Sequence, residues 1–296
     1  MAKMPLKNAI FLFSAALIWG MAFVAQSVGM DYMGPFAFNG LRFLIGSAVL
    51  VPVILVRRAH GIAGVQKAGL ARTVTGGILC GIFLFMASMM QQMGIMTTDV
   101  GKAGFLTAMY IVIVPLLSFF VHGETSVRLW ISVFLACIGL YFLSISGGFS
   151  PERGDIMLIA CAFLFSLHIM CIDRFGDVDG VTLSCIQFLT AGILASAGSI
   201  LTEGFYFRLE GGGLVSVLYA GIMSCGIAYT FQILGQHGAD PAVSSLILSL
   251  ESVVSVIAGF VILQQSLTAR ELFGCVIMFA AIVLVQLPKR ERPLKL

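Results

Sequence analysis

The stretch AVSSLILSLESVVSVIAGFVIL, residues 242–263, decides the class of fold. Within it, Glu251 is the single ionisable side chain, and all other residues are apolar, small or hydroxyl-bearing. A helix needs about 20 predominantly apolar residues to cross the hydrocarbon core of a bilayer. The stretch therefore predicts a membrane-spanning helix that carries a carboxyl group near its middle.

The whole chain has the composition of a membrane protein. Of its 296 residues, 59% are hydrophobic and 10% are charged, whereas soluble domains carry about 25% charged residues. A soluble enzyme is excluded on this ground. We predict an all-α integral membrane protein, without an extramembrane domain, whose ten transmembrane helices lie near residues 8–28, 36–56, 74–94, 101–121, 129–147, 155–173, 181–202, 214–235, 242–263 and 270–288.

The first of these spans has a competing interpretation as a removable signal peptide. Lys3 and Lys7 precede its apolar run, and Ala25 is a possible cleavage position. The run continues to Val28 and has a counterpart in the second half of the chain, which favours a span.

The distribution of Lys and Arg between the predicted loops indicates the orientation in the membrane. With the N-terminus inside, the outer loops contain only Arg153, Arg208 and Arg270. Both termini are then expected in the cytoplasm. The residues expected at the cytoplasmic side are Lys3, Lys7, Arg57, Arg58, Lys67, Arg72, Arg128, Arg174, Lys289, Arg290, Arg292 and Lys295.

No cofactor, metal site or nucleic-acid partner is expected. The net charge is only +3 and the basic residues do not cluster. The chain has no GxxxxGK[ST] motif, and its four histidines are dispersed, so neither nucleotide hydrolysis nor another enzymatic activity is indicated. The seven cysteines lie in apolar runs without a CxxC pair and are interpreted as small buried hydrophobic residues: Cys80, Cys137, Cys161, Cys171, Cys185, Cys225 and Cys275.

The two halves of the chain resemble each other. At a shift of 141 residues, Gly94, Asp99, Val112 and Phe119 coincide with Gly235, Asp240, Val253 and Phe260. At a shift of 145, Arg42-Phe43-Leu44 aligns with Gln187-Phe188-Leu189. We predict two five-helix repeats, residues 1–147 and 148–296. Because five is odd, the second repeat must be inverted relative to the first, as in many transporters whose substrate site lies at the midplane.

Several short segments resemble one known family. IWG (18–20), PFAFNGLRFL (35–44), AGFLT (103–107), Pro115 and GE (123–124) resemble the signatures of EamA-type proteins of the drug/metabolite transporter superfamily. The resemblance covers essentially the whole chain. It implies ten helices in two inverted repeats, and export of small metabolites, often amino acids or related compounds, across the bacterial inner membrane.

The chain departs from this family pattern in its ninth span. Glu251 is followed by Ser252 where the family often has proline, and Gln264-Gln265 stand where the family often has a glutamate. The missing proline removes the usual cause of a kink in the ninth span and so puts in doubt any gating that needs one.

Glu251 and Arg42 are ionisable side chains inside predicted spans, where each needs a partner or a water-filled cavity. Glu251 has Tyr110 at its repeat-related position. It either binds an amino group or a proton during transport, or it holds helices together as a protonated carboxyl. Arg42 has two possible roles. In the structural role, its guanidinium reaches the membrane interface or pairs with another side chain of the bundle. In the functional role, it binds a substrate carboxylate. Together, the two residues would suit an amino-acid-like zwitterion.

Further polar residues within the spans are candidates for orienting contacts or for helix packing. His168 is also a candidate proton carrier, next to Glu251, because the ordinary pKa of histidine is near physiological pH. The full set of candidate substrate-binding residues is Trp19, Gln26, Asn39, Arg42, Gln91, Gln92, Tyr110, His168, Gln187, Tyr229, Gln232 and Glu251.

The fifth and tenth spans contain almost no strongly polar side chains. We expect both at the periphery, against lipid or in a homodimer contact, with the other eight helices around a cavity. The function predicted for this arrangement is secondary-active export of small neutral or aromatic metabolites by alternating access, with protons as a possible coupling ion. The alternative is a channel or a structural membrane protein without coupled transport.

Overall fold

A computed structural model of the protein covers residues 4–60, 69–123, 126–144, 152–204, 206–264, 266 and 268–286. Within these ranges the protein is all-helical, with one isolated β-bridge between Met33 and Phe207. Its helices are α1 (Leu6–Gly29), α2 (Pro35–Ala59), α3 (Leu70–Ile95), α4 (Val100–Ala108), α5 (Tyr110–His122), α6 (Val127–Ser144), α7 (Arg153–Arg174), α8 (Gly180–Thr202), α9 (Gly212–Leu218), the π-helix η1 (Tyr219–Tyr229), α10 (Thr230–Gln236), α11 (Pro241–Leu248), α12 (Glu251–Leu263) and α13 (Ala269–Gln286).

Eight of the predicted spans are long and apolar enough to cross a membrane, judged by length and composition. They are α1, α2, α3, the α4–α5 pair, α7, α8, the α9–η1–α10 series and the α11–α12 pair. The predicted fifth and tenth spans coincide with shorter apolar helices at 127–142 and 272–285, within α6 and α13. The all-helical membrane fold is confirmed, and the count of ten crossings stays a prediction.

The orientation also stays a prediction. Several of its basic residues, namely Lys3, Lys67, Lys289, Arg290, Arg292 and Lys295, lie outside the described residues, as do Glu124 and Gln265 of the family-like segments.

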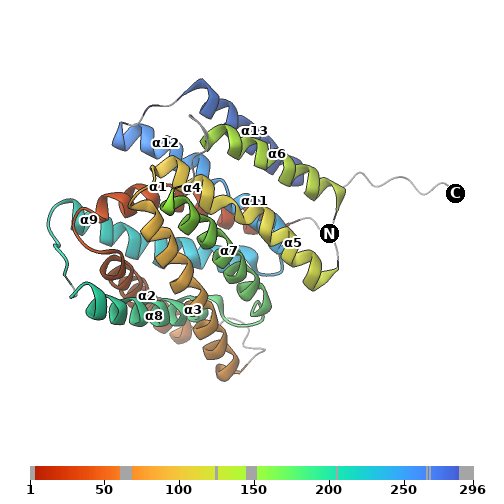
Figure 1. Ribbon diagram of the computed structural model, residues 1–296. Helices are drawn as coiled ribbons and strands as arrows, with labels where there is room; N and C mark the ends of the chain where they lie inside the picture. Colours follow the sequence, from red (N-terminus) through yellow and green to blue (C-terminus); the bar gives the residue numbers. More distant parts are fainter. Residues whose placement is uncertain are drawn as a thin grey trace.

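α1 lies at the centre of the bundle, in contact with α12, η1 and α10 (Figure 1). Gly20 allows α12 to approach closely: a Cβ atom there would overlap Val254 and lie 2.8 Å from the backbone oxygen of Glu251. Ala15 and Ala16 of α1 are completely buried. The first helix is thus a core element of the bundle, as the span interpretation predicts.

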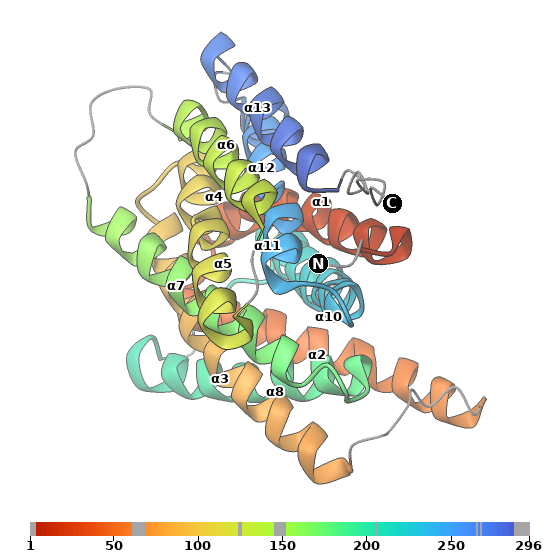
Figure 2. The same ribbon diagram turned by 90° about the vertical axis from the view of Figure 1, so that its right-hand side faces the viewer.

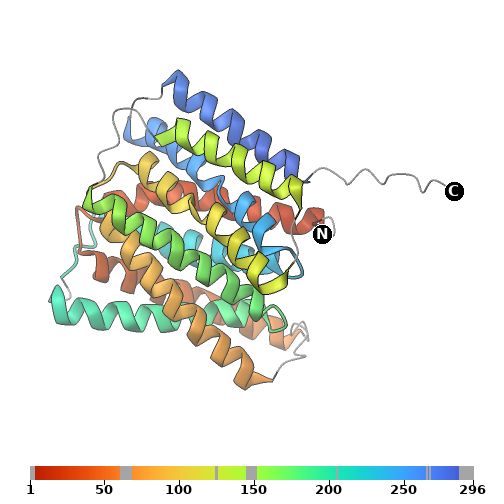
Figure 3. The same cartoon turned by 45° about the vertical axis from the view of Figure 1, so that its right-hand side comes forward.

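α6 and α13 pack against each other at one edge of the bundle, opposite α2, α3 and α8 (Figures 1 and 3). Gly139 of α6 allows this contact, because a Cβ atom there would lie 2.9 Å from the backbone oxygen of Gly274. The outer faces of both helices are apolar and exposed, with Phe134 at 67% and Val276 at 60%. The expected peripheral position is therefore observed, and a homodimer through these helices remains a prediction.

Two helix pairs are interrupted at equivalent places. α4 and α11 begin at Val100 and Pro241, and α5 and α12 begin at Tyr110 and Glu251, a separation of 141 residues in both cases. The pairs lie next to each other, with α4 against α12 and α5 against α11 (Figure 2). Residues in the left-handed conformation, Gly123 and Gln264, end the two pairs at the same spacing.

The ninth span is interrupted although the family's proline is missing, since α11 ends at Leu248 and α12 starts at Glu251. Serine hydroxyls provide the physical reason. Ser249 donates to the Leu246 carbonyl at 2.7 Å, and Ser252 donates to the Ser249 carbonyl at 2.7 Å. Such side-chain bonds compete with the backbone ladder and bend helices.

Candidate substrate-binding cavity

The helix interruptions bring Tyr110 and Glu251 together. Each is the first residue after its break, and the Tyr110 hydroxyl donates to Glu251 Oε1 at 2.9 Å. Tyr110 is 3% exposed and Glu251 is 5% exposed. The residues that the sequence repeat relates therefore form a direct bond in the interior of the bundle.

Arg42 also points into the bundle. Its guanidinium Nη1 donates to Gln26 Oε1 at 3.1 Å, and the guanidinium carbon Cζ lies 4.8 Å from the centre of the Phe43 ring. The side chain is only 2% exposed, so it does not reach the membrane interface. Among the described residues, its Nε and Nη2 atoms have no hydrogen-bond partner. A buried guanidinium with free donors is suited to binding an anionic group such as a carboxylate.

Aromatic and amide side chains complete the surroundings. The Trp19 and Tyr229 rings meet edge to face, with centroids 4.5 Å apart. Gln91 Nε2 lies 3.5 Å from Thr107 Oγ1, and Gln232 Oε1 is buried without a partner among the described residues. These groups supply an apolar surface with a few hydrogen-bonding positions, which is typical of small-molecule sites.

One cavity joins these groups. The volume of the cavity that is accessible to a water-sized molecule is about 30 Å³. This volume holds a few water molecules at most. A larger solute can bind only if the surrounding helices move apart. The lining residues are Trp19, Phe23, Gln26, Arg42, Gln91, Tyr110, Phe165, Ile169, Ser224, Tyr229, Gln232, Leu248 and Glu251.

Most of the candidate residues from the sequence line this cavity. The expectation that eight spans surround the cavity is not met, because α8 contributes none of the lining residues. α8 lies behind α2 and α3, with which it is in extensive contact. The candidates that line the cavity are Trp19, Gln26, Arg42, Gln91, Tyr110, Tyr229, Gln232 and Glu251.

The other candidates, Asn39, Gln92, His168 and Gln187, are completely buried away from the cavity wall. Asn39 Nδ2 donates to the Ser88 carbonyl, and Gln92 Nε2 donates to the Gln26 carbonyl. His168 Nε2 and Gln187 Oε1 are 3.0 Å apart and join α7 to α8. Their contacts are those of helix packing, and a role of these four residues in substrate binding stays a prediction.

Five lining residues were not expected. Phe23 lies four residues after the candidate Trp19, and this helical spacing could have identified it. Phe165, Ile169 and Leu248 have no polar signal. Ser224 lies five residues before Tyr229 in η1, and residues five apart share a face in a π-helix but not in an α-helix.

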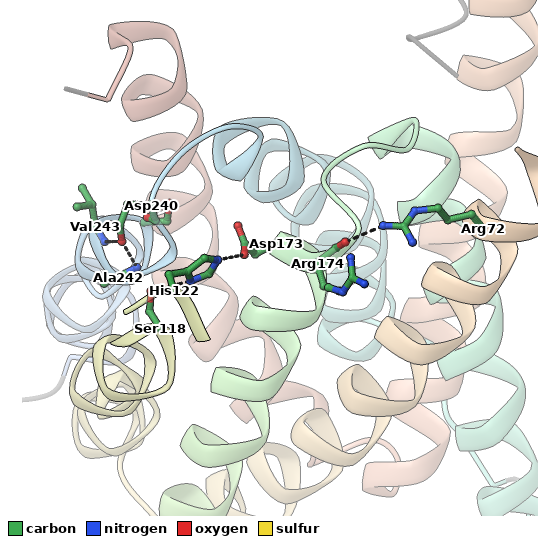
Figure 4. Close-up of polar contacts among 9 residues, drawn as sticks. Arg72, Ser118, His122, Asp173, Arg174, Asp240, Ala242 and Val243 are labelled. Carbon is green, nitrogen blue, oxygen red and sulfur yellow. Dashed lines mark hydrogen bonds and ion pairs between the residues drawn. The ribbon is translucent and has the colours of Figure 1, made fainter. Parts of the chain in front are cut away.

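Ion pairs join the two halves of the chain at both ends of α7. Near its start, Lys102 Nζ lies 2.8 Å from Asp155 Oδ2. Near its end, the His122 ring lies 3.4 Å from Asp173, beside the capping residue Asp240 (Figure 4). The two positions are about 27 Å apart along the helix, and Phe165 and Ile169 of the cavity wall lie between them.

A second, wider depression lies at the His122 end. Its volume is about 750 Å³. It is bordered by Arg57, which pairs with Asp179 at 3.2 Å, and by Arg72, which pairs with Asp177 at 2.8 Å. The Arg72 guanidinium lowers the pKa of Asp177 below its usual range. We call this space the vestibule.

We predict that Lys102→Met lowers the thermal stability of the protein. The change leaves the Asp155 carboxylate, which is 2% exposed, without its cation. Because Lys102 itself is partly exposed, we expect a cost of roughly 2 kcal/mol. The melting temperature of the purified protein measures this effect. Adding Asp155→Asn should restore most of it, and a double variant no more stable than Lys102→Met would contradict the prediction.

A multi-span helical membrane protein with a central cavity that combines buried charges, amides and aromatic rings has the architecture of a membrane transporter. The EamA-like transporter family model matches residues 6–145 and again residues 152–287. The chain belongs to this family.

Its relatives span nearly the whole chain. A protein named "Uncharacterized transporter" from Archaeoglobus fulgidus is 28% identical over 273 residues, which cover 92% of this chain and 83% of that protein. "Uncharacterized transporter YoaV" from Bacillus subtilis is 23% identical, over 93% of this chain and 95% of its own length. "Uncharacterized inner membrane transporter YedA" from Escherichia coli is 22% identical, over 99% of this chain and 94% of its own length.

A solved structure shares the fold. It superposes with a TM-score of 0.77 at 21% sequence identity, over 94% of this chain and 96% of the other. Together, the family and the relatives identify the protein as a multi-pass membrane transporter of the drug/metabolite transporter type.

Proposed function

We propose that the protein is a secondary-active transporter that exports amino acids, or related zwitterionic metabolites, with neutral or aromatic side chains from the bacterial cytoplasm. One observation carries the proposal: Arg42, a base, and Glu251, an acid, are both buried and line the same cavity. A buried acid and a buried base match the ammonium and the carboxylate of a zwitterion.

In the proposed complex, the substrate carboxylate binds the free nitrogens of Arg42 and the ammonium group binds Glu251. A charge-assisted bond of this kind is about twice as strong as a neutral one. The apolar part of the substrate then contacts Trp19, Phe23 and Phe165. A phosphorylated substrate is disfavoured, because Arg42 is the only Lys or Arg among the residues that line the described cavity.

The proposed mechanism is alternating access by two inverted repeats, residues 1–147 and 148–296. The equal spacing of the interrupted helices supports the repeat, as does the way the family model matches the chain twice. Lys102–Asp155 and His122–Asp173 join residues of the two matched segments at opposite ends of the bundle. Breaking one set of pairs while keeping the other would open the cavity to one side at a time.

Glu251 is the proposed coupling residue. A proton and a substrate ammonium group compete for the same carboxylate, so binding of one requires release of the other. The Tyr110 hydroxyl, which donates to Oε1, leaves Oε2 for this exchange. A proton entering on the outside would then displace the substrate, which favours export. The proposed location is the inner membrane, with both termini in the cytoplasm.

The test uses purified protein in liposomes loaded with unlabelled L-phenylalanine. We predict that external radiolabelled phenylalanine exchanges into these liposomes. Phenethylamine, which lacks the carboxylate, and 3-phenylpropionate, which lacks the amine, should each compete at least about tenfold less well, since each loses one charged contact.

Equal competition by all three compounds would contradict the zwitterion site. Phenylalanine flux without stimulation by internal phenylalanine would favour the channel alternative. Protein-free liposomes are the control for leakage.

A further inference from the structure

Two of the seven cysteines meet in the structure. Cys80 of α3 donates its thiol proton to Cys171 Sγ of α7, and the sulfur atoms are 3.3 Å apart. A disulfide bond is about 2.05 Å long, so the sulfurs need to approach by little more than 1 Å. Both cysteines lie in apolar surroundings, as their interpretation as small hydrophobic residues predicts, but the sequence did not indicate their contact, because helix packing brings together residues 91 positions apart.

The thiol pair lies next to the vestibule. Cys80 is completely buried, whereas Cys171 is partly exposed. Both belong to a small apolar cluster that includes Ile172, Phe175 and Ile233, and these three residues also line the vestibule. A small, uncharged oxidant in the vestibule therefore has only a short distance to travel to the sulfurs.

We propose that Cys80 and Cys171 form a redox modification site, which a peroxide converts into a disulfide that ties α3 to α7. One sulfur attacks hydrogen peroxide, so that an S–O bond forms, the O–O bond breaks and one water leaves. The second sulfur attacks the resulting sulfenic acid; an S–S bond forms, the S–O bond breaks, and the hydroxyl leaves with the thiol proton as the second water. The two sulfurs lose two electrons, and the peroxide gains them.

A disulfide at this position would restrict the movement of the two halves of the chain relative to each other. α3 belongs to the first segment matched by the family model and α7 to the second. The helices are in contact along their length, from Gly76 beside Phe175 to Gly94 beside Leu158. A covalent link between them prevents the two segments from moving apart at the vestibule end. This arrest of exchange rests on the proposed function, whereas the formation of the disulfide does not.

The primary experiment follows the thiols by mass spectrometry. Purified full-length protein is treated with hydrogen peroxide, alkylated with N-ethylmaleimide and digested without reduction. We expect a linked peptide pair containing Cys80 and Cys171, the loss of their two free thiols, and reversal by dithiothreitol. Cys171→Ser should form no such link, while Cys137→Ser, which changes a partly buried cysteine on α6, should form it as readily as the unaltered protein.

Absence of the linked pair would overturn the proposal, as would equal thiol loss in Cys171→Ser. Phenylalanine exchange in liposomes then tests the arrest. We expect the exchange rate of the unaltered protein to fall at least about tenfold after oxidation and to recover with dithiothreitol. In Cys171→Ser, we expect oxidation to leave the exchange rate unchanged. A linked protein that still exchanges phenylalanine would overturn the arrest. Failure of the unoxidised protein to exchange phenylalanine would count against the proposed function and leave the mass-spectrometric result standing.

Discussion

Glu251→Gln is expected to lower phenylalanine exchange about 100-fold and to abolish its response to a pH gradient. The substitution keeps the size of the side chain and an oxygen that can accept from Tyr110. It removes the charge that binds the ammonium group and the site that exchanges a proton. Losing one partner of a buried charge pair costs upward of 2 kcal/mol, and about 2.8 kcal/mol corresponds to a factor of about 100.

The measurement is exchange in liposomes, with and without an imposed pH gradient. Tyr110→Phe is the matched control, because it removes the bond to Glu251 Oε1 and retains the carboxylate. We expect it to reduce exchange by about tenfold, near the lower end of the range for a hydrogen bond to a charged group, and to keep the response to the gradient. If exchange by Glu251→Gln matched that of the unaltered protein, Glu251 would have only a packing role.

Arg42→Gln is expected to weaken phenylalanine binding about 100-fold without weakening the binding of phenethylamine. The reason is that only phenylalanine has the carboxylate that the Arg42 nitrogens are proposed to bind. Arg42→Lys keeps the positive charge and loses the planar pair of donors, so an intermediate loss of about tenfold is expected.

Trp19 offers a direct measure of binding because it lines the cavity. The chain has two tryptophans, and Trp130→Phe leaves Trp19 as the one fluorescent indole. Titration of this protein with either compound gives the dissociation constant. Arg42 also donates a hydrogen bond to Gln26 and lies over the Phe43 ring. The melting temperatures of the variants and of the unaltered protein must therefore be compared, to separate lost binding from lost stability. If Arg42→Gln weakened both compounds equally, the role of Arg42 would be structural.

The repeat in the sequence paired two residues that meet in the site. The shift of 141 residues relates Tyr110 to Glu251, and these residues form a hydrogen bond. In the proposed inverted repeat, residues near the midpoint of equivalent spans would face the same symmetry axis, and this is how a one-dimensional pattern can single out such a pair. The same shift relates the start of α4 to that of α11.

The faces of the helices were less predictable. In lipid, a helix gains no hydrophobic advantage by turning one apolar face inward rather than outward. Periodicity therefore did not separate Gln91, which lines the cavity, from its neighbour Gln92, which bonds the Gln26 carbonyl. It also did not indicate that the side chains of His168 on α7 and Gln187 on α8 form a hydrogen bond with each other.

The amino-acid sequence by itself determined that the chain is a bundle of apolar helices in a membrane, and it identified Arg42 and Glu251 as ionisable side chains within the spans. Those properties depend on local composition, because the cost of a charge in lipid does not depend on its neighbours along the chain. Only the tertiary structure decided that these two charges share a cavity, that the ninth span is interrupted without proline, and that Cys80 meets Cys171. The cavity and the thiol pair depend on contacts between distant helices, which local composition does not encode. The interruption depends on short-range hydrogen bonds between serine hydroxyls and the backbone, and only the folded helix shows which of these bonds form.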